Sequence, residues 1–154
     1  MRITRWGEYG VHICAFLAKR QDQHPDIPVS ASEIAEQVQI GSDYALQILQ
    51  RLKNGSLIIS TRGSKGGYCL AKDKNEITLK DILLATEGET FELMCESAPL
   101  HTQCCDSNSS CGLKGIWGKL QVHVDEFLIS YTLNDLEGLF FKEKSQLISK
   151  IGSQ

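Results

Sequence analysis

Residues 30–72, SASEIAEQVQIGSDYALQILQRLKNGSLIISTRGSKGGYCLAK, decide the fold of this chain. Ser30 and Glu33 have the spacing of a capping box, in which each side chain binds a backbone N–H at the start of a helix. After the turn QIGS a second helix begins at Ser42, and its apolar residues form one stripe at helical spacing: Ala45, Ile48, Leu49 and Leu52. Two short helices joined by a tight turn are typical of a helix-turn-helix unit.

The second half of this stretch predicts a β-hairpin. The β-prone runs LIISTR (57–62) and YCLAK (68–72) flank the glycine-rich segment GSKGG (63–67). A helix-turn-helix followed by a hairpin is a winged helix, so the expected fold class is mainly α with a small β wing. In this architecture the second helix of the pair enters the major groove of DNA.

Helical patterns flank the winged unit on both sides. A helix is expected over residues 7–21, another from Thr78, and a long apolar stripe runs from Leu113 to Tyr131. The long stripe has no partner element near it in the sequence, which predicts packing against a second copy in a homodimer. The expected division is a winged helix-turn-helix DNA-binding domain over residues 1–90, a cysteine-bearing loop over 91–111, a dimerisation helix over 112–141 and a C-terminal tail over 142–154.

Composition and charge narrow the class of protein. The 154 residues suffice for one domain with a core and an oligomerisation arm. The sequence has neither an apolar run long enough to cross a membrane nor a signal-peptide pattern, so a cytoplasmic protein without a membrane partner is expected. The net charge of −3 argues against indiscriminate nucleic-acid binding, but it allows a local basic surface.

A local basic surface is predicted around the hairpin. Between Arg51 and Lys74 there are six basic residues and one acidic residue, Asp73. Basic groups neutralise phosphates, and hydroxyl, amide and guanidinium groups contact base edges. Arg62 is the candidate for the minor groove, because a narrow groove has an enhanced negative potential. The predicted contacts with double-stranded DNA are Ser42, Asp43, Tyr44, Gln47, Arg51, Arg62, Gly63 and Lys65. The alternative is a basic face that is only solvated.

The six cysteines leave several chemistries open. Three of them lie within residues 104–111, CCDSNSSC, and Cys95 precedes this segment. In a reducing cytosol, cluster ligands, a zinc site or a redox switch are expected ahead of a structural disulfide. Cys14, on an apolar helical stripe, and Cys69, on a strand, are most simply small core residues.

Four motifs resemble those of a known family: the opening MRIT, the wing RGSKGGY, the phrase ITLKDIL and the later TLNDL. From residue 1 to about residue 138 the chain resembles the Rrf-two-type family of bacterial winged-helix regulators, which includes IscR, NsrR and RsrR. The resemblance implies a dimeric transcription factor that binds operator DNA and has no small-molecule substrate. Many members hold an iron–sulfur cluster on a three-cysteine segment before the dimerisation helix, and sense redox state, nitric oxide or iron–sulfur status.

The resemblance also implies a set of cluster ligands. Cys105 and Cys111, followed by Trp117, match the family's spacing of its last two cluster cysteines and of a tryptophan on the dimerisation helix. Glu8 and His12, one helical turn apart, match the glutamate–histidine pair of the RsrR-like branch. Two thiolates with two nitrogen or oxygen ligands favour a 2Fe-2S cluster of raised reduction potential.

Other site chemistries remain open at this point. Cys95 and Cys104 are further candidate ligands: a 4Fe-4S cluster would use Cys95, Cys105 and Cys111 with Glu8, whereas Cys104 is an extra thiol relative to the family. Zinc on these cysteines would be structural and redox-silent, and a thiol switch would need no metal. A cysteine-dependent enzyme is the remote alternative; the sequence offers no cysteine–histidine–acid set, so no enzymatic activity is expected.

Overall fold

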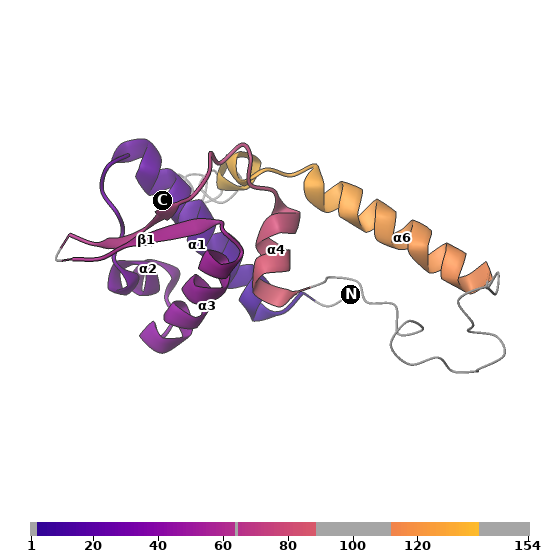
Figure 1. Ribbon diagram of the computed structural model, residues 1–154, viewed down its shortest axis with the longest axis horizontal. Coiled ribbons are helices and arrows are strands. Elements are labelled where there is room, and N and C mark those ends of the chain that lie inside the picture. The colour runs from indigo at the N-terminus through magenta and orange to yellow at the C-terminus, as the bar shows by residue number, and fades with distance from the viewer. Residues whose placement is uncertain (1–2, 64, 89–111, 139–154) are drawn as a thin grey trace, which may run out of the picture.

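The computed structural model describes residues 3–63, 65–88 and 112–138 (Figure 1). Helices α1 (Arg5–Gln23), α2 (Ala31–Val38) and α3 (Ser42–Asn54) come first, followed by strands β1 (Ile58–Thr61) and β2 (Gly67–Leu70), helix α4 (Leu79–Glu87) and helix α6 (Gly112–Ile129). The two strands form an antiparallel sheet. The fold class predicted from the sequence, mainly α with a small β wing, is confirmed.

Helix α1 lies at the centre of the core. It packs against α2, α3, α4 and β2, and its residues 13–18 are all buried. The predicted apolar stripe of α3 is buried as well, at Ala45, Ile48, Leu49 and Leu52. Because burial of apolar surface is the main favourable term in folding, this core fixes which face of α3 points outward.

The start of α2 confirms half of the predicted capping box. The Ser30 hydroxyl accepts a hydrogen bond from the Glu33 backbone N–H at 3.2 Å. The Glu33 carboxylate instead forms an ion pair with Arg20 of α1, with 3.1 Å between Oε1 and Nη2. The start of α2 is therefore tied to α1 as well as to its own cap.

The wing is anchored to the body through Val29, in the loop between α1 and α2. Val29 forms an antiparallel bridge with Tyr68 of β2, in which the Tyr68 N–H donates to the Val29 carbonyl at 2.8 Å and the Val29 N–H donates back at 2.9 Å. The preceding residue, Gly67, lies against the same backbone, because a Cβ atom there would be 2.5 Å from the Val29 carbonyl oxygen. The close approach of two backbones therefore requires glycine at this position.

The long C-terminal helix is shorter than the sequence predicted. The expected dimerisation helix covers residues 112–141, whereas α6 ends at Ile129 and a new helical segment follows Thr132. The Thr132 N–H donates to the Asp135 carboxylate at 2.9 Å, and the Thr132 hydroxyl accepts from the Asp135 N–H at 3.4 Å. This reciprocal cap begins a second helix and is the physical reason for the interruption.

The motifs TLKD and TLND begin two helical segments with the same cap and pair with each other. Thr78 and Asp81 form a complete capping box at the start of α4, as Thr132 and Asp135 do after α6. The two segments meet in an antiparallel bridge, in which the Leu133 N–H donates to the Ile77 carbonyl at 2.7 Å. Leu133 is fully buried, so the segment after α6 packs in the core of the winged helix.

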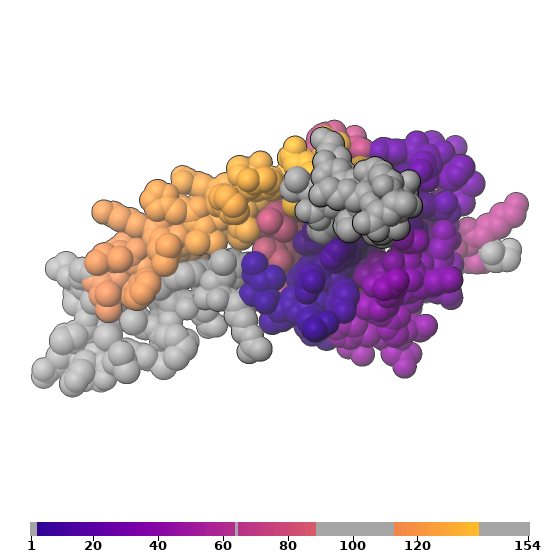
Figure 2. Space-filling view, turned by 180° about the vertical axis from the view of Figure 1, so that it is seen from behind, coloured from indigo at the N-terminus to yellow at the C-terminus, as the bar shows by residue number. Residues whose placement is uncertain are grey.

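Helix α6 projects from the body on the side opposite to the hairpin tip (Figure 1). Lys80 of α4 and Asp125 of α6 form an ion pair of 3.0 Å. Figure 2 shows the side chains of α6, in orange, extending away from the indigo-to-magenta body. Many of its apolar side chains are exposed: Leu113, Ile116, Trp117, Leu120, Val122, Phe127 and Ile129. Within the described ranges, no helix is both long and apolar enough to cross a membrane.

Candidate DNA-binding face and metal-ligand residues

The outer face of α3 is the first part of the candidate site. Its predicted contacts Ser42, Asp43 and Gln47 are all exposed. Leu46 is exposed as well, although this apolar residue is not among the contacts predicted from the sequence. Its distance of three residues from Asp43, off the buried stripe, is the sequence signal that places it on this face.

Tyr44 and Arg51, which were also predicted as DNA contacts, have partners within the protein. The Tyr44 ring packs edge-on against Trp6, with ring centroids 4.8 Å apart, and against Tyr9 at 5.8 Å. The Arg51 guanidinium lies over the Trp6 ring, 4.2 Å from its centroid, and Nη1 donates to the Thr86 carbonyl. These contacts fasten α3 to α1 and α4.

The hairpin tip holds the remaining predicted contacts. Arg62, Gly63 and Lys65 are exposed there. Gly63 has a φ of 119°, a conformation that side chains disfavour. Lys53 of α3 donates to the hydroxyl of Ser60 on β1 at 2.7 Å, so the hairpin is linked to α3 by a side-chain contact.

Lys74, another basic residue of this region, is paired within the protein. Its ammonium group contacts Asp22 of α1 and, at 3.0 Å, the carboxylate of Glu137. Hydrogen bonds to Asp22 and Glu137 raise the pKa of Lys74. Because two carboxylates offset its charge, Lys74 contributes less to an anion-binding surface than the exposed cations at the wing tip.

Two of the candidate cluster ligands lie on α1. Glu8 is exposed and His12 is half-buried, and their spacing of four residues puts them on one face of the helix. A carboxylate oxygen and an imidazole nitrogen are both common metal donors. The predicted cysteine ligands, Cys95, Cys104, Cys105 and Cys111, lie outside the described residues. Inside the described ranges, no three histidine, cysteine or acidic residues are grouped to hold a metal ion.

Cys14 and Cys69 are free thiols within the body. Cys14 is fully buried, and burial raises its pKa to about 12, so the thiol is neutral at physiological pH. Cys69 is half-buried on β2, and burial raises its pKa as well. The thiolate is the reactive and metal-binding form of cysteine, so the neutral Cys14 thiol is unreactive. Its burial confirms Cys14 as a small core residue.

Glu87, at the C-terminal end of α4, caps the start of α1. Its carboxylate accepts hydrogen bonds from the Thr4 N–H, the Thr4 hydroxyl and the Gly7 N–H, each at 2.8 Å. Burial alone would raise the pKa of Glu87, but these hydrogen bonds and the charge of Arg51 hold the pKa below its usual value. The carboxylate is therefore ionised at neutral pH and stabilises the positive end of α1.

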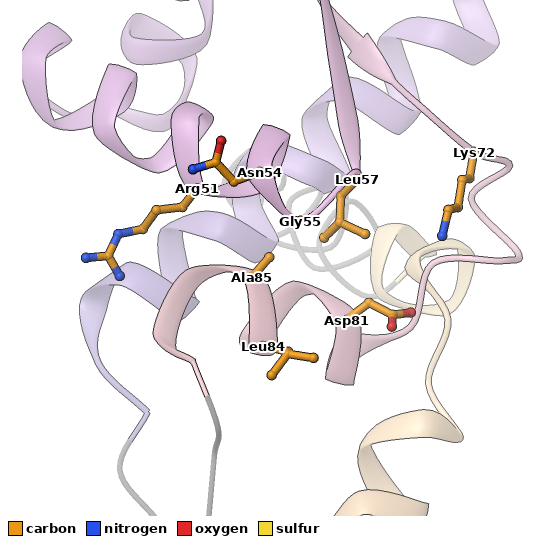
Figure 3. Close-up of a pocket in the computed structure, with 8 residues that line it drawn as sticks. All are labelled: Arg51, Asn54, Gly55, Leu57, Lys72, Asp81, Leu84 and Ala85. Atoms are coloured by element: carbon orange, nitrogen blue, oxygen red, sulfur yellow. The ribbon is translucent and has the colours of Figure 1, made fainter.

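A pocket of about 340 Å³ lies between the C-terminal end of α3 and helix α4 (Figure 3). Arg51 lies at one end and Lys72 at the other, with Leu57, Asp81 and Ala85 between them. Asp81 is engaged in the capping box of α4, and Arg51 in the contacts with α1 and α4 described above. We therefore assign the pocket to the packing of α3 against α4.

Known proteins share this architecture. CymR (YrzC), the global cysteine regulator of B. subtilis, is similar with a TM-score of 0.69 and 29% identity, over 90% of this chain and 98% of that chain. IscR of T. potens is similar with a TM-score of 0.66 and 28% identity, over 95% of this chain and 91% of that chain. The HTH-type transcriptional regulator IscR of Photorhabdus laumondii subsp. laumondii is 29% identical over 136 residues, which are 88% of this chain and 79% of that protein.

A family model, Rrf2, described as an iron-dependent transcriptional regulator, matches residues 3–137. The match begins just before α1, includes the helix-turn-helix and the wing, and ends in the segment after α6. The relatives are named as transcriptional regulators and not as enzymes, as the sequence predicted. The chain belongs to the Rrf2 family of DNA-binding transcriptional regulators.

Proposed function

We propose that the chain is a homodimeric regulator that senses redox state, nitric oxide or iron–sulfur status through an iron–sulfur cluster. In the favoured arrangement, Cys105 and Cys111 of one subunit and Glu8 and His12 of the other hold a 2Fe-2S cluster. The observation that supports this arrangement best is the position of Glu8 and His12 on one face of α1, outside the core. The iron dependence in the family's description supports it as well.

The donors on α1 suit such a cluster. This part of α1 packs against the core through Gly7, Gly10 and Val11, which are buried, and Gly10 lies against Thr86 of α4. The packing therefore does not depend on the exposed side chain of Glu8. Glu8 is therefore available to bind a ligand, and His12, which is half-buried, can add a nitrogen donor. When bound, a cluster with two thiolate and two nitrogen or oxygen ligands supplies one-electron redox chemistry at a raised potential.

Hydrogen bonds connect the C-terminal end of α4, which directly precedes the cysteine segment, with α1 and α3. Gly88 ends α4 and is followed directly by residues 89–111, which contain the candidate cysteines. Just before it, Glu87 caps α1, and the Thr86 carbonyl accepts a hydrogen bond from Arg51 of α3. A displacement of the cysteine segment or of α1 would therefore act on the orientation of α3, which supports coupling between sensing and DNA affinity.

A cluster-free thiol regulator is the second candidate. It is favoured by the similarity to CymR of Staphylococcus aureus, whose structure is known in an oxidized form. In this case Cys104 or Cys105 would form a disulfide with Cys111, and the two thiols would lose two protons and two electrons to an external oxidant. Zinc bound by the same segment would also give a regulator without a cluster.

The cluster is tested on full-length protein purified without oxygen. Equal amounts of iron and sulfide and a brown or red visible spectrum are expected. Cys105→Ala and Cys111→Ala should each abolish the cluster, and His12→Ala should leave it labile or shifted in potential, because a weaker ligand replaces the imidazole. Cys69→Ala is the matched control and should retain the cluster.

Cys95→Ala separates the two types of cluster. A normal cluster in this variant supports the 2Fe-2S arrangement, whereas complete loss indicates a 4Fe-4S cluster on Cys95, Cys105 and Cys111 with Glu8. Colourless protein with bound zinc, or with a reversible disulfide, would contradict both arrangements and support the cluster-free alternatives.

Arg62 and Arg51 are expected to affect DNA binding in different ways. Arg62 is exposed at the wing tip, so Arg62→Ala should weaken binding and reduce the slope of log affinity against log salt by about 1. Arg51 is exposed as well, but its guanidinium is engaged by Trp6 and Thr86, so Arg51→Ala should lower thermal stability and reduce that slope less than Arg62→Ala does. Fluorescence anisotropy at several salt concentrations measures both slopes. An unchanged slope for Arg62→Ala, or an equal decrease for Arg51→Ala, would contradict this division of roles.

A further inference from the structure

Leu46 differs from the other leucines of α3. Its side chain is 45% exposed, whereas Leu49 and Leu52 are fully buried. The residues on its side of the helix are polar and exposed: Asp43 three residues before it and Gln50 four residues after it. The core does not require Leu46, yet it lies in the middle of the face that a helix-turn-helix presents to the major groove.

The described part of the chain leaves this face of α3 open. Helix α6, with its exposed apolar side chains, projects away from the side that bears α2, α3 and the hairpin (Figure 1). Gln50 is partly engaged, because its Nε2 donates to Oδ1 of Asn54 at 2.8 Å. A single leucine among polar groups is too small a patch to dock another protein. The major groove, however, offers it one apolar partner, the C5-methyl group of thymine.

We propose that Leu46 reads a thymine of the operator through contact with its C5-methyl group. Leucine has no hydrogen-bond donor or acceptor, so the methyl group is the feature by which it can recognise this base. Asp43 and Gln47 lie beside it with a carboxylate suited to cytosine and an amide suited to adenine. Leu46 would therefore add an apolar contact to a set of polar readers on the same helix. The proposal rests on α3 being the helix that enters the groove.

The test removes the methyl group from the DNA and the leucine from the protein. A binding duplex is first selected from a random-sequence library with the full-length protein, and each thymine is then replaced in turn by deoxyuridine. The wild type should lose affinity at one thymine per half-site, by about fourfold for a buried methyl group. Leu46→Ala should lose a similar factor on the unmodified duplex and nothing further on the uracil duplex, because both changes remove the same contact.

Leu84→Ala is the matched control. Leu84 is 42% exposed but lies on α4, so this variant should keep the wild-type sensitivity to uracil. Equal uracil sensitivity of the wild type and Leu46→Ala, or a wild type insensitive at every thymine, would overturn the methyl contact and leave DNA binding intact. Failure of the protein to select any duplex would instead overturn the docking of α3 on which the proposal rests.

Discussion

Replacing Ile116 and Leu120 by glutamate is expected to convert the protein into monomers and to weaken operator binding on the order of 100-fold, as the second half-site contact is lost. The two side chains are 60% and 40% exposed and lie one turn apart on α6. Phe127 continues the same stripe and is 60% exposed. Burial of this stripe against a second copy would remove it from water, and two buried carboxylates would oppose that association.

Sedimentation and DNA binding measure this prediction together. The single variant Ile116→Glu is also compared with a control, Val122→Glu. Val122 is 53% exposed but lies on the opposite side of α6 from the stripe. The control should remain a dimer and keep its affinity. A double variant that still sediments as a dimer would show that α6 is not the main interface, whereas dissociation of both single variants would indicate a general loss of helix structure.

The winged helix could be predicted from the sequence because its signals are local. The stripe of α3, the Ser30 cap and the glycine-rich turn each depend on residues close together in the chain. The interruption after α6 is harder to recognise, because apolar residues continue at helical spacing from Leu128 through Tyr131, although TLND has the spacing of a capping box. After α6 the chain instead contacts a distant segment, because the Leu133 N–H donates to the carbonyl of Ile77. Its side chain enters the core of the winged helix.

The candidate site shows the same difference between local and long-range information. Side-chain chemistry predicts Tyr44 and Arg51 as DNA contacts, whereas their partners within the protein, Trp6 and Thr86, lie on other helices and become visible only in the fold. Leu46 is not among the contacts predicted from the sequence, since an apolar residue on an amphipathic helix is usually buried. The positions of Glu8 and His12 on α1 depend on helix periodicity alone. The candidate cysteines lie far along the chain, within residues 89–111, and helix periodicity carries no information about such long-range contacts.

Gly67→Ala is expected to lower the free energy of unfolding by about 2–4 kcal/mol, because it combines overpacking with the loss of backbone hydrogen bonds. A Cβ atom on Gly67 would lie 2.5 Å from the carbonyl oxygen of Val29 and 2.7 Å from its carbonyl carbon. These are backbone atoms, so no side-chain rotation relieves the clash. The Val29–Tyr68 bridge would have to open, and the wing would lose its anchor to the loop before α2. DNA affinity should therefore decrease together with stability.

Chemical denaturation of Gly67→Ala and a matched glycine variant tests this explanation of the wing motif. Gly41→Ala is the control, because Gly41 precedes α3 with an ordinary φ of −63° and a Cβ atom there meets nothing within 4 Å. Its cost should stay within about 1 kcal/mol, the range expected for an exposed helix cap. If both variants unfold at the same denaturant concentration as the wild type, the close approach at Gly67 is not required. If both are destabilised equally, the cost comes from lost backbone freedom and not from contact with Val29.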